Sequence, residues 1–167
     1  MDLEKFIRTV PDFPIKGINF YDITTLFENN TTFNYIIDLL FDRYKSLRID
    51  KVVGIEARGF MLGAALAYKL NVGFVPIRKK GKLPYKTISE TYSLEYGEDT
   101  VEIHIDAIKK NQNILLVDDL IATGGTANAS AKLIKNLDGI IKECCFIIDL
   151  PELGGSNILI QKGFNVF

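Results

Sequence analysis

One stretch of the chain, residues 113–128, combines side chains whose types and spacing suit the binding of a phosphate ester. Its apolar run, residues 114–117, is typical of a buried strand, and helical spacing of apolar residues begins at residue 127. The turn between them consists of Ala122, Thr123, Gly124, Gly125 and Thr126. A helix N-terminus presents free backbone N–H groups with positive dipole character, which the two glycines would let a phosphate approach closely. Because the threonines add hydroxyl donors, the turn is predicted to bind a phosphate monoester.

Two carboxylates, Asp118 and Asp119, stand at the carboxyl end of that predicted strand. Carboxylates do not bind phosphate, so we expect them to face another part of the ligand, and vicinal ribose hydroxyls donate the hydrogen bonds that carboxylates accept. The turn lacks the Gly-Lys-Ser/Thr of a P-loop and the Gly-x-Gly-x-x-Gly spacing of dinucleotide-binding turns. An ordinary strand-to-helix turn, the plain alternative, would not need paired carboxylates here.

Two further groups of charged residues follow other predicted strands. Residues 56–58, which include Arg58, follow one strand, and the basic stretch 78–84 follows the next. Ligands of parallel α/β sheets bind beyond the carboxyl ends of the strands, so one ligand could reach all three groups. Arg78 and Lys82 would then neutralise a pyrophosphate, with Mg²⁺ bridging its oxygens and keeping much of its shell as water. On its own the basic stretch would better fit a solvated surface loop; the acidic pair favours the ligand site.

Around these groups the chain alternates predicted strands and helices. Apolar spacing predicts helices at residues 3–10, from Thr31 or Thr32 to 44, at 59–70 and from 127. Strands are predicted at 51–55, 74–77, 114–117 and 140–150. Within 92–105 a hairpin is predicted about Gly97. Residues 11–26 are too rich in Pro and Gly for a helix and are predicted to form a structured loop. This order favours an α/β fold with a mainly parallel central sheet flanked by helices, in a single domain.

The composition fits one globular domain, since 47% of the 167 residues are hydrophobic and 25% are charged. A net charge of −1 and a pI near 5.9 argue against a surface that coats nucleic acid. No apolar run reaches membrane-spanning length and the first residues lack the basic start of a signal peptide, which favours the cytoplasm. Cys144 and Cys145 are expected to be buried thiols on opposite faces of a strand, and His104 a surface strand residue.

With its acidic pair and its Ala-Thr-Gly-Gly-Thr turn, the central stretch resembles the phosphoribosyl diphosphate (PRPP) loop of the type I phosphoribosyltransferases. Further motifs resemble the adenine phosphoribosyltransferase family, in order from about residue 6 to the end: Val10-Pro-Asp-Phe-Pro, Gly17-Ile-Asn-Phe-Tyr-Asp-Ile, Glu56-Ala-Arg-Gly-Phe, Arg78-Lys-Lys-Gly-Lys-Leu-Pro, Tyr92-Ser-Leu-Glu-Tyr-Gly and Asp149-Leu-Pro-Glu-Leu-Gly-Gly. Tyr21 departs from the pattern, because the family often has arginine there.

The resemblance implies the type I phosphoribosyltransferase fold. Its parts would be a small N-terminal hood and base-binding segment at about 1–30, a core at about 31–150 and a C-terminal cover at 151–167, with a mobile hairpin loop at 83–98. The implied reaction is adenine + PRPP ⇌ AMP + pyrophosphate, a purine-salvage step carried out by a homodimer. The implied Mg²⁺ is held mainly through PRPP or pyrophosphate and water rather than by protein ligands.

The resemblance also implies a role for each candidate residue. Ala122, Thr123, Gly124, Gly125 and Thr126 hold the 5′-phosphate, Asp118 and Asp119 bind the ribose hydroxyls, Arg78 and Lys82 the pyrophosphate, and Arg58 lies near the base and the pyrophosphate. Phe20 stacks on adenine while backbone groups of Ile18 and Asn19 read the purine edge. Glu95, with Tyr96 beside it, transfers the proton, since closure of a lid would raise the pKa of such a carboxylate. From the residues alone, Phe20 fits a core position and Glu95 a solvated one.

Two other functions use the same phosphate loop. A 6-oxopurine or xanthine phosphoribosyltransferase would need a lysine or arginine that reads the oxo group, and the motifs around Phe13 and Ser93 favour adenine instead. A PRPP-sensing regulator would keep the loop without catalysis, but it should carry a nucleic-acid-binding element, for which this short acidic chain has no room. The presence of Lys82 and Glu95 also argues for turnover.

Overall fold

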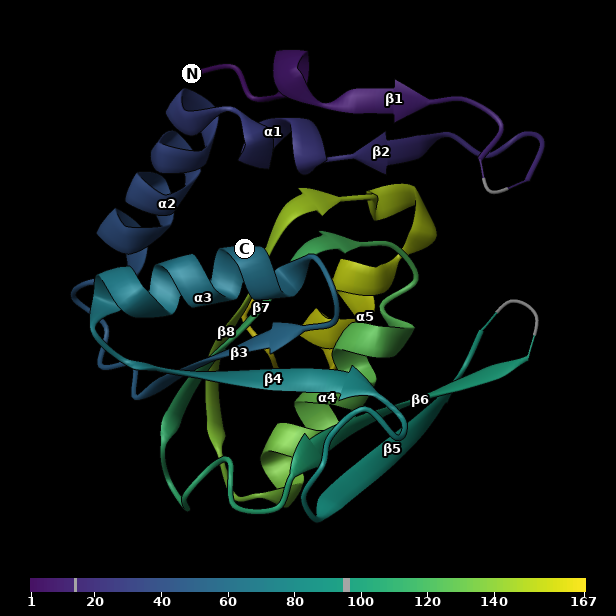
Figure 1. Ribbon diagram of the computed structural model, residues 1–167. Helices are drawn as coiled ribbons and strands as arrows, with labels where there is room; N and C mark the ends of the chain where they lie inside the picture. Colours follow the sequence, from purple (N-terminus) through teal and green to yellow (C-terminus); the bar gives the residue numbers. More distant parts are fainter. Residues whose placement is uncertain (14, 95–96) are drawn as a thin grey trace. The chain divides into compact units, whose positions relative to one another are not determined.

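The computed structural model in Figure 1 describes residues 1–13, 15–94 and 97–167. The chain forms two compact units, residues 1–43 and 44–167. The second unit contains the predicted phosphate loop between its strand and its helix, and the first contains the aromatic stretch around Phe20.

The first unit is built on a short antiparallel pair of strands followed by two helices. Its elements are η1 (Glu4–Phe6), β1 (Arg8–Val10), β2 (Phe20–Asp22), α1 (Thr24–Glu28) and α2 (Asn30–Tyr44), whose last residue lies in the second unit. The predicted helix at 3–10 is wrong: a single 3₁₀ turn precedes β1, where the β-branched Thr9 lies opposite Tyr21 of β2. The loop predicted at 11–26 also contains β2 and the start of α1.

The long helix α2 begins one residue before the predicted range. Its cap is Asn29, whose Oδ1 accepts hydrogen bonds from the backbone N–H of Thr31 at 2.9 Å and of Thr32 at 3.2 Å. The Thr32 hydroxyl instead donates to the carbonyl of Leu26 at 2.7 Å. A start at Thr31 or Thr32 would imply a threonine cap. This is wrong, because Asn29 caps the helix and the Thr32 side chain bonds to the preceding helix α1.

A six-stranded sheet forms the centre of the second unit, in the order β5-β6-β4-β3-β7-β8 (Figure 1). Its strands are β3 (Lys51–Ile55), β4 (Gly73–Lys79), β5 (Thr87–Ser93), β6 (Glu98–His104), β7 (Asn113–Ile121) and β8 (Ile140–Asp149). Strands β4, β3, β7 and β8 are parallel, whereas β6 runs antiparallel to both β4 and β5. The predicted hairpin and the mainly parallel central sheet are confirmed, and β7 is four residues longer at its carboxyl end than predicted.

Helices α3 (Gly59–Leu70) and α4 (Gly125–Asn136) lie on opposite faces of this sheet (Figure 1). Alternation along the strands sends Val53 of β3 and Leu116 of β7 into one core with α4. On the α3 side, a Cβ at Gly54 would lie 2.7 Å from the Phe74 ring, so the small residue admits that ring. The 3₁₀ turn η2 (Pro151–Leu153) and helix α5 (Gly155–Gln161) follow β8.

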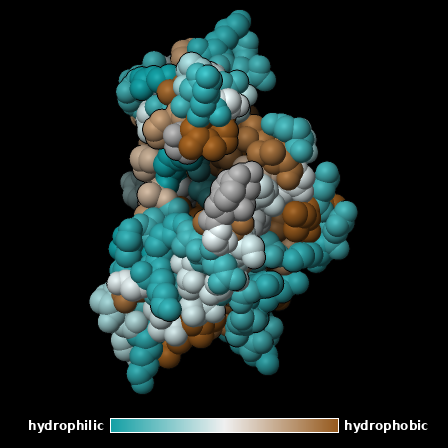
Figure 2. Space-filling view, turned by 90° about the vertical axis from the view of Figure 1, so that its right-hand side faces the viewer, coloured by the Kyte–Doolittle hydropathy of each residue, from teal (hydrophilic) through white to brown (hydrophobic). Residues whose placement is uncertain are grey.

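The cysteine prediction is confirmed, because Cys144 and Cys145 are both fully buried on β8. His104 is half-buried, with its ring 6.1 Å from that of Tyr85, so it is not the plain surface residue predicted. Among the residues that the structure describes, no helix is both long and apolar enough to cross a membrane. On the face seen in Figure 2, hydrophilic residues predominate and hydrophobic ones form small separate groups.

Candidate active site

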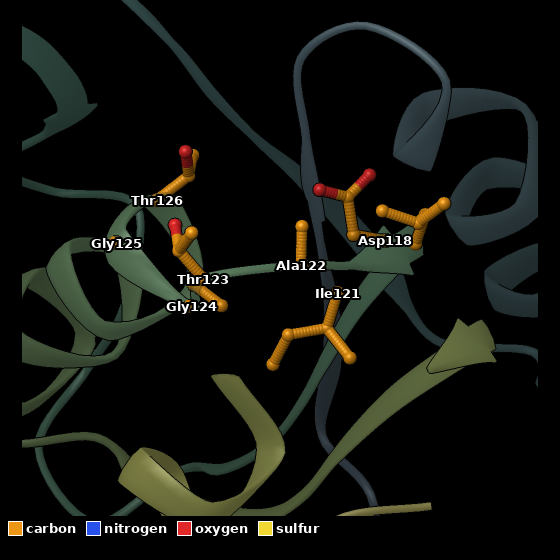
Figure 3. Close-up of a pocket in the computed structure, with 9 residues that line it drawn as sticks. Asp118, Ile121, Ala122, Thr123, Gly124, Gly125 and Thr126 are labelled. Carbon is orange, nitrogen blue, oxygen red and sulfur yellow. The ribbon is translucent and has the colours of Figure 1, made fainter. Parts of the chain in front are cut away.

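A pocket of about 190 Å³ lies where β7 passes into α4. Its lining consists of Asp118, Leu120, Ile121, Ala122, Thr123, Gly124, Gly125, Thr126 and Ala127. Figure 3 shows the hydroxyls of Thr123 and Thr126 and the carboxylate of Asp118 on one side of the loop, whereas Ile121 points to the other side. The structure therefore brings the predicted phosphate loop and one predicted ribose-binding carboxylate into a single pocket.

The shape of this loop depends on close backbone contacts that exclude larger residues. Gly124 has a φ of +79°, in the left-handed region where L side chains are strained, and a Cβ there would lie 2.9 Å from Gly155. The N–H of Gly155 donates to the carbonyl of Ala122 at 2.9 Å, which ties the loop to the start of α5. The backbone N–H groups at the start of α4 are thereby left at the pocket.

The acidic pair divides between two environments, because neighbouring residues on a strand face opposite sides of the sheet. Asp118 lines the pocket, whereas Asp119 is 4% exposed and its Oδ2 lies 2.6 Å from Nε of Arg58. Burial, and then the negative charge of Asp119, raise the pKa of Asp118 well above its ordinary value. Asp118 is thus a pocket group, and Asp119 is the partner of a guanidinium that follows β3.

The cations of the predicted pyrophosphate site converge on a carboxylate that the sequence analysis did not select. Nζ of Lys82 lies 2.8 Å and Nε of Arg78 3.2 Å from the carboxylate oxygens of Glu56, which also accepts the backbone N–H of Lys79 at 2.9 Å. Burial acts to raise the pKa of Glu56, but these donors outweigh it and lower the pKa to about 2. The peptide bond between Glu56 and Ala57 is cis. The Glu56 carboxylate therefore holds the Arg78 and Lys82 side chains together at the carboxyl ends of β3 and β4.

Tyr92 of β5 is a second residue that the sequence analysis did not place in the site. The Thr126 hydroxyl donates to Oη of Tyr92 at 2.9 Å, and a Cβ at Gly125 would lie 3.0 Å from the Tyr92 ring. The alternation of the predicted hairpin could have indicated an inward-facing tyrosine, but nothing local in the sequence pairs it with Thr126, 34 residues away.

The predicted base-binding residues belong to the first unit. The ring of Phe20 is half-buried and packs edge-to-face on that of Phe13, with centroids 5.1 Å apart, while Ile18 is 41% exposed. The residues alone had suggested a core position for Phe20, but this residue is only half-buried. Asn19 is also exposed. The predicted proton-transfer residue Glu95 and its neighbour Tyr96 lie outside the described residues.

No three His, Cys, Asp or Glu side chains within residues 1–13, 15–94 and 97–167 are grouped so that they could hold a metal ion. The Asp118 carboxylate at the pocket is an oxygen donor of the kind that Mg²⁺ accepts beside phosphate oxygens and water.

The chain belongs to the phosphoribosyl transferase domain family, which it matches over residues 22–155. Two relatives indicate a particular enzyme within this family. It is 54% identical to the adenine phosphoribosyltransferase of Methylobacillus flagellatus over 167 residues, which is 100% of this chain and 95% of the relative. It is 58% identical to that of Ruegeria pomeroyi over 164 residues, 98% of this chain and 92% of the relative.

Solved structures of the same enzyme are similar throughout. Adenine phosphoribosyltransferase from Thermoanaerobacter pseudethanolicus has a TM-score of 0.95 at 47% identity, covering 99% of this chain and 95% of the other. The Saccharomyces cerevisiae enzyme, complexed with adenine and D-2,5-dideoxy-2,5-imino-altritol 1,6-bisphosphate, has a TM-score of 0.93 at 40% identity, with coverage of 99% and 95%. The predicted type I phosphoribosyltransferase fold is confirmed.

Proposed function

We propose that this chain transfers the 5-phosphoribosyl group of PRPP to adenine, giving AMP and pyrophosphate, and that it serves purine salvage. The observation that carries the proposal is the pocket at the end of β7, in which a phosphate loop and the Asp118 carboxylate share one side. Near-full-length identity to adenine phosphoribosyltransferases supports the choice of base.

In this proposal the 5′-phosphate of PRPP binds the loop of Ala122, Thr123, Gly124, Gly125 and Thr126. Backbone N–H groups at the start of α4 and the two threonine hydroxyls are the donors, and the dianion is the acceptor. Asp118 accepts a hydrogen bond from a ribose hydroxyl. Asp119 is the proposed acceptor for the second ribose hydroxyl, and its buried carboxylate also pairs with the Arg58 guanidinium.

The leaving pyrophosphate is held by Arg78 and Lys82, which exchange the Glu56 carboxylate for phosphate oxygens, with Arg58 beside them. Mg²⁺, when bound, would neutralise charge on the diphosphate and bridge its oxygens, with water and substrate as most of its ligands. Loss of pyrophosphate from C1′ builds positive charge on the ribose. The tasks of the chain are therefore to position the reactants and to stabilise the leaving group.

Adenine is bound by the loop of Ile18, Asn19 and Phe20, with the Phe20 ring stacked on the base and backbone groups reading the purine edge. Ile18 and Asn19 are both exposed. The N–H of Ile18 donates to the carbonyl of Ile15 at 3.2 Å and its carbonyl accepts the N–H of Phe13 at 3.0 Å, so bonds within the loop fix the backbone beside Asn19. Glu95 takes part in proton transfer at the purine nitrogen, with Tyr96 beside it, as the family resemblance implies. We further propose that the protein acts in the cytoplasm as a homodimer, which light scattering on a sizing column tests by its molar mass.

The proposal is tested by measuring pyrophosphate release from PRPP with Mg²⁺ in the presence of adenine, hypoxanthine, guanine or xanthine, beside a control without base. Release with adenine alone is the expected result. Release with an oxopurine instead would reassign the substrate. Binding of PRPP without release by any base would indicate a PRPP-sensing regulator and remove the catalytic roles given above.

A further inference from the structure

We propose that Tyr92 is a positioning residue for the 5′-phosphate, which it serves by holding the Thr126 hydroxyl through a hydrogen-bond chain that begins at Lys79. The proposal deepens the proposed function and rests on it, because it concerns the phosphate of PRPP and AMP. It gives Tyr92 no contact with the substrate: the tyrosine acts through Thr126.

The Tyr92 hydroxyl lies at the centre of a polar network inside the hairpin. The side chain is 9% exposed, and its Oη accepts a hydrogen bond from Thr126 Oγ1 at 2.9 Å and one from Lys79 Nζ at 3.3 Å. The same hydroxyl donates to Oδ2 of Asp99 at 3.2 Å. Lys79 and Asp99 also form an ion pair with each other. The network therefore connects the phosphate loop with strands β4, β5 and β6.

The Tyr92 ring is fixed against the loop as well as bonded to it. Gly125 leaves space for this ring, since a Cβ at that position would lie 3.0 Å from the ring carbon Cδ2. The Lys79 ammonium lies 5.9 Å from the centroid of the ring, within the range of a cation–π contact. With its ring packed and its hydroxyl bonded to three side chains, Tyr92 has little freedom to turn away from Thr126.

The direction of the hydrogen bonds gives the network its function. A phosphate dianion has only acceptor oxygens, and the Thr126 hydroxyl has a single proton, which it donates to Tyr92 in this structure. When Thr126 donates to a phosphate, its oxygen is free to accept, and the Tyr92 hydroxyl can turn from Asp99 to donate to it. Asp99 stays satisfied, because it keeps Lys79 and the backbone N–H of Thr100 at 2.8 Å.

The reversed chain runs from Lys79 through Tyr92 and Thr126 to the phosphate, with a cation at one end and an anion at the other. Each hydroxyl in it donates once and accepts at least once, so neither is left unsatisfied when the ligand binds. Burial opposes the positive charge on Lys79, but its hydrogen bonds to Asp99 and Tyr92 and their charges together outweigh burial and raise the pKa, so the cation persists at neutral pH. The chain thus orients the Thr126 hydroxyl toward the phosphate.

The test is the affinity of the full chain for ribose 5-phosphate and for inorganic pyrophosphate, measured by calorimetry for wild type and Tyr92→Phe. We expect Tyr92→Phe to weaken ribose 5-phosphate binding by about three- to tenfold, the range of one lost hydrogen bond to an anion-binding group, and to leave pyrophosphate binding unchanged. In turnover, the KM for PRPP should rise by a similar factor with little change in kcat. Tyr68→Phe, at a tyrosine 89% exposed on α3, is the matched control and should behave as wild type.

A cycle of variants separates positioning from a structural effect. Tyr92→Phe should have no further effect in a Thr126→Val background, but it should keep its effect beside Thr126→Ser, which retains a hydroxyl. Equal loss in all three backgrounds, or tighter binding of ribose 5-phosphate by Tyr92→Phe, would overturn the inference. If wild type neither binds ribose 5-phosphate nor forms AMP, the proposed function fails first. If wild type does both and Tyr92→Phe equals it, only the inference fails.

Discussion

Nε of Arg58 lies 2.6 Å from Oδ2 of Asp119, and this ion pair connects the start of α3 with strand β7. The Asp119 side chain is 5% exposed and that of Arg58 31%, so the carboxylate is the more buried partner. A buried carboxylate depends on its counter-charge, because water cannot replace it. The two residues therefore set both the stability of this region and the separate roles of the acidic pair.

Arg58→Gln is expected to lower the free energy of unfolding at pH 7 by roughly 1–3 kcal/mol, since it leaves an ionised buried carboxylate without its partner. Burial already raises the pKa of Asp119 above its ordinary value against the opposing charge of Arg58, and loss of Arg58 raises this pKa further. A raised carboxyl pKa costs stability at high pH, so the deficit should shrink as the pH falls toward 4. Urea denaturation from pH 4 to 8 measures this loss of unfolding free energy.

The double variant Arg58→Gln with Asp119→Asn is the control and should recover most of the loss. A deficit that does not depend on pH in both variants would contradict the account.

Asp118→Asn is expected to stabilise the protein at pH 7 while lowering turnover. The folded-state pKa of Asp118 is raised by burial and by Asp119, so its ionised form costs free energy once the pH exceeds the ordinary carboxyl pKa. Asparagine removes that cost but accepts a hydrogen bond from a ribose hydroxyl less strongly than a carboxylate does. Denaturation and initial-rate assays measure the two effects. Asp138→Asn, at an exposed carboxylate, should change neither, and a destabilised Asp118→Asn would refute the assignment.

Gly124→Ala tests the shape of the phosphate loop. It adds strain at a φ of +79° and a Cβ that would lie 2.9 Å from the Gly155 backbone, so we expect a loss of roughly 2–4 kcal/mol of unfolding free energy and little residual PRPP binding. Gly163→Ala is the matched control, because its φ is +84° but nothing lies within 4 Å of the added Cβ. It should cost about 1 kcal/mol and keep activity. Equal effects of the two variants in thermal melts would mean that the contact with Gly155 is unimportant.

Glu56 is predicted to make stability depend on pH in the acid range. Its folded pKa of about 2 lies below the ordinary value of 4.5, so its ionised form stabilises the fold above about pH 4.5, and this contribution declines as the pH falls toward 2. The difference in unfolding free energy between wild type and Glu56→Gln should be constant near neutral pH and shrink below pH 4.5. A difference that does not change between pH 7 and pH 3 would show that Glu56 is not held by its cationic neighbours.

Glu95→Gln is expected to lower kcat while leaving PRPP affinity largely intact, because the proposed role is proton transfer and not substrate binding. Single-turnover rates and equilibrium binding of PRPP separate the two quantities. Unchanged turnover would remove Glu95 from the mechanism.

The sequence predicted the parts of the fold that local patterns determine. The helix at 59–70 and the strand at 51–55 have the predicted bounds. The phosphate loop follows its strand as predicted, but helix α4 begins at Gly125, two residues before the predicted start, so Gly125 and Thr126 lie in its first turn. The helix predicted at residues 3–10 did not form, because Arg8–Val10 pair with β2, about ten residues further on, and this pairing overrides a helical spacing only about two turns long.

The candidate site was predicted as a set of polar groups but not as a set of pairs. Nothing in the sequence could assign Asp119 to Arg58, Glu56 to Lys82 or Tyr92 to Thr126, because each pair joins side chains from different elements of the sheet and its loops. Even the two carboxylates looked equivalent, and only their opposite facing on β7 separates a pocket group from a buried partner.

The most direct test of the central claim is the identity and stoichiometry of the product formed from labelled adenine and PRPP with Mg²⁺, with pyrophosphate measured in the same samples. The account predicts one AMP for each pyrophosphate released, and no product after Gly124→Ala. Pyrophosphate released without AMP, or no conversion of adenine under conditions in which PRPP binds, would contradict it.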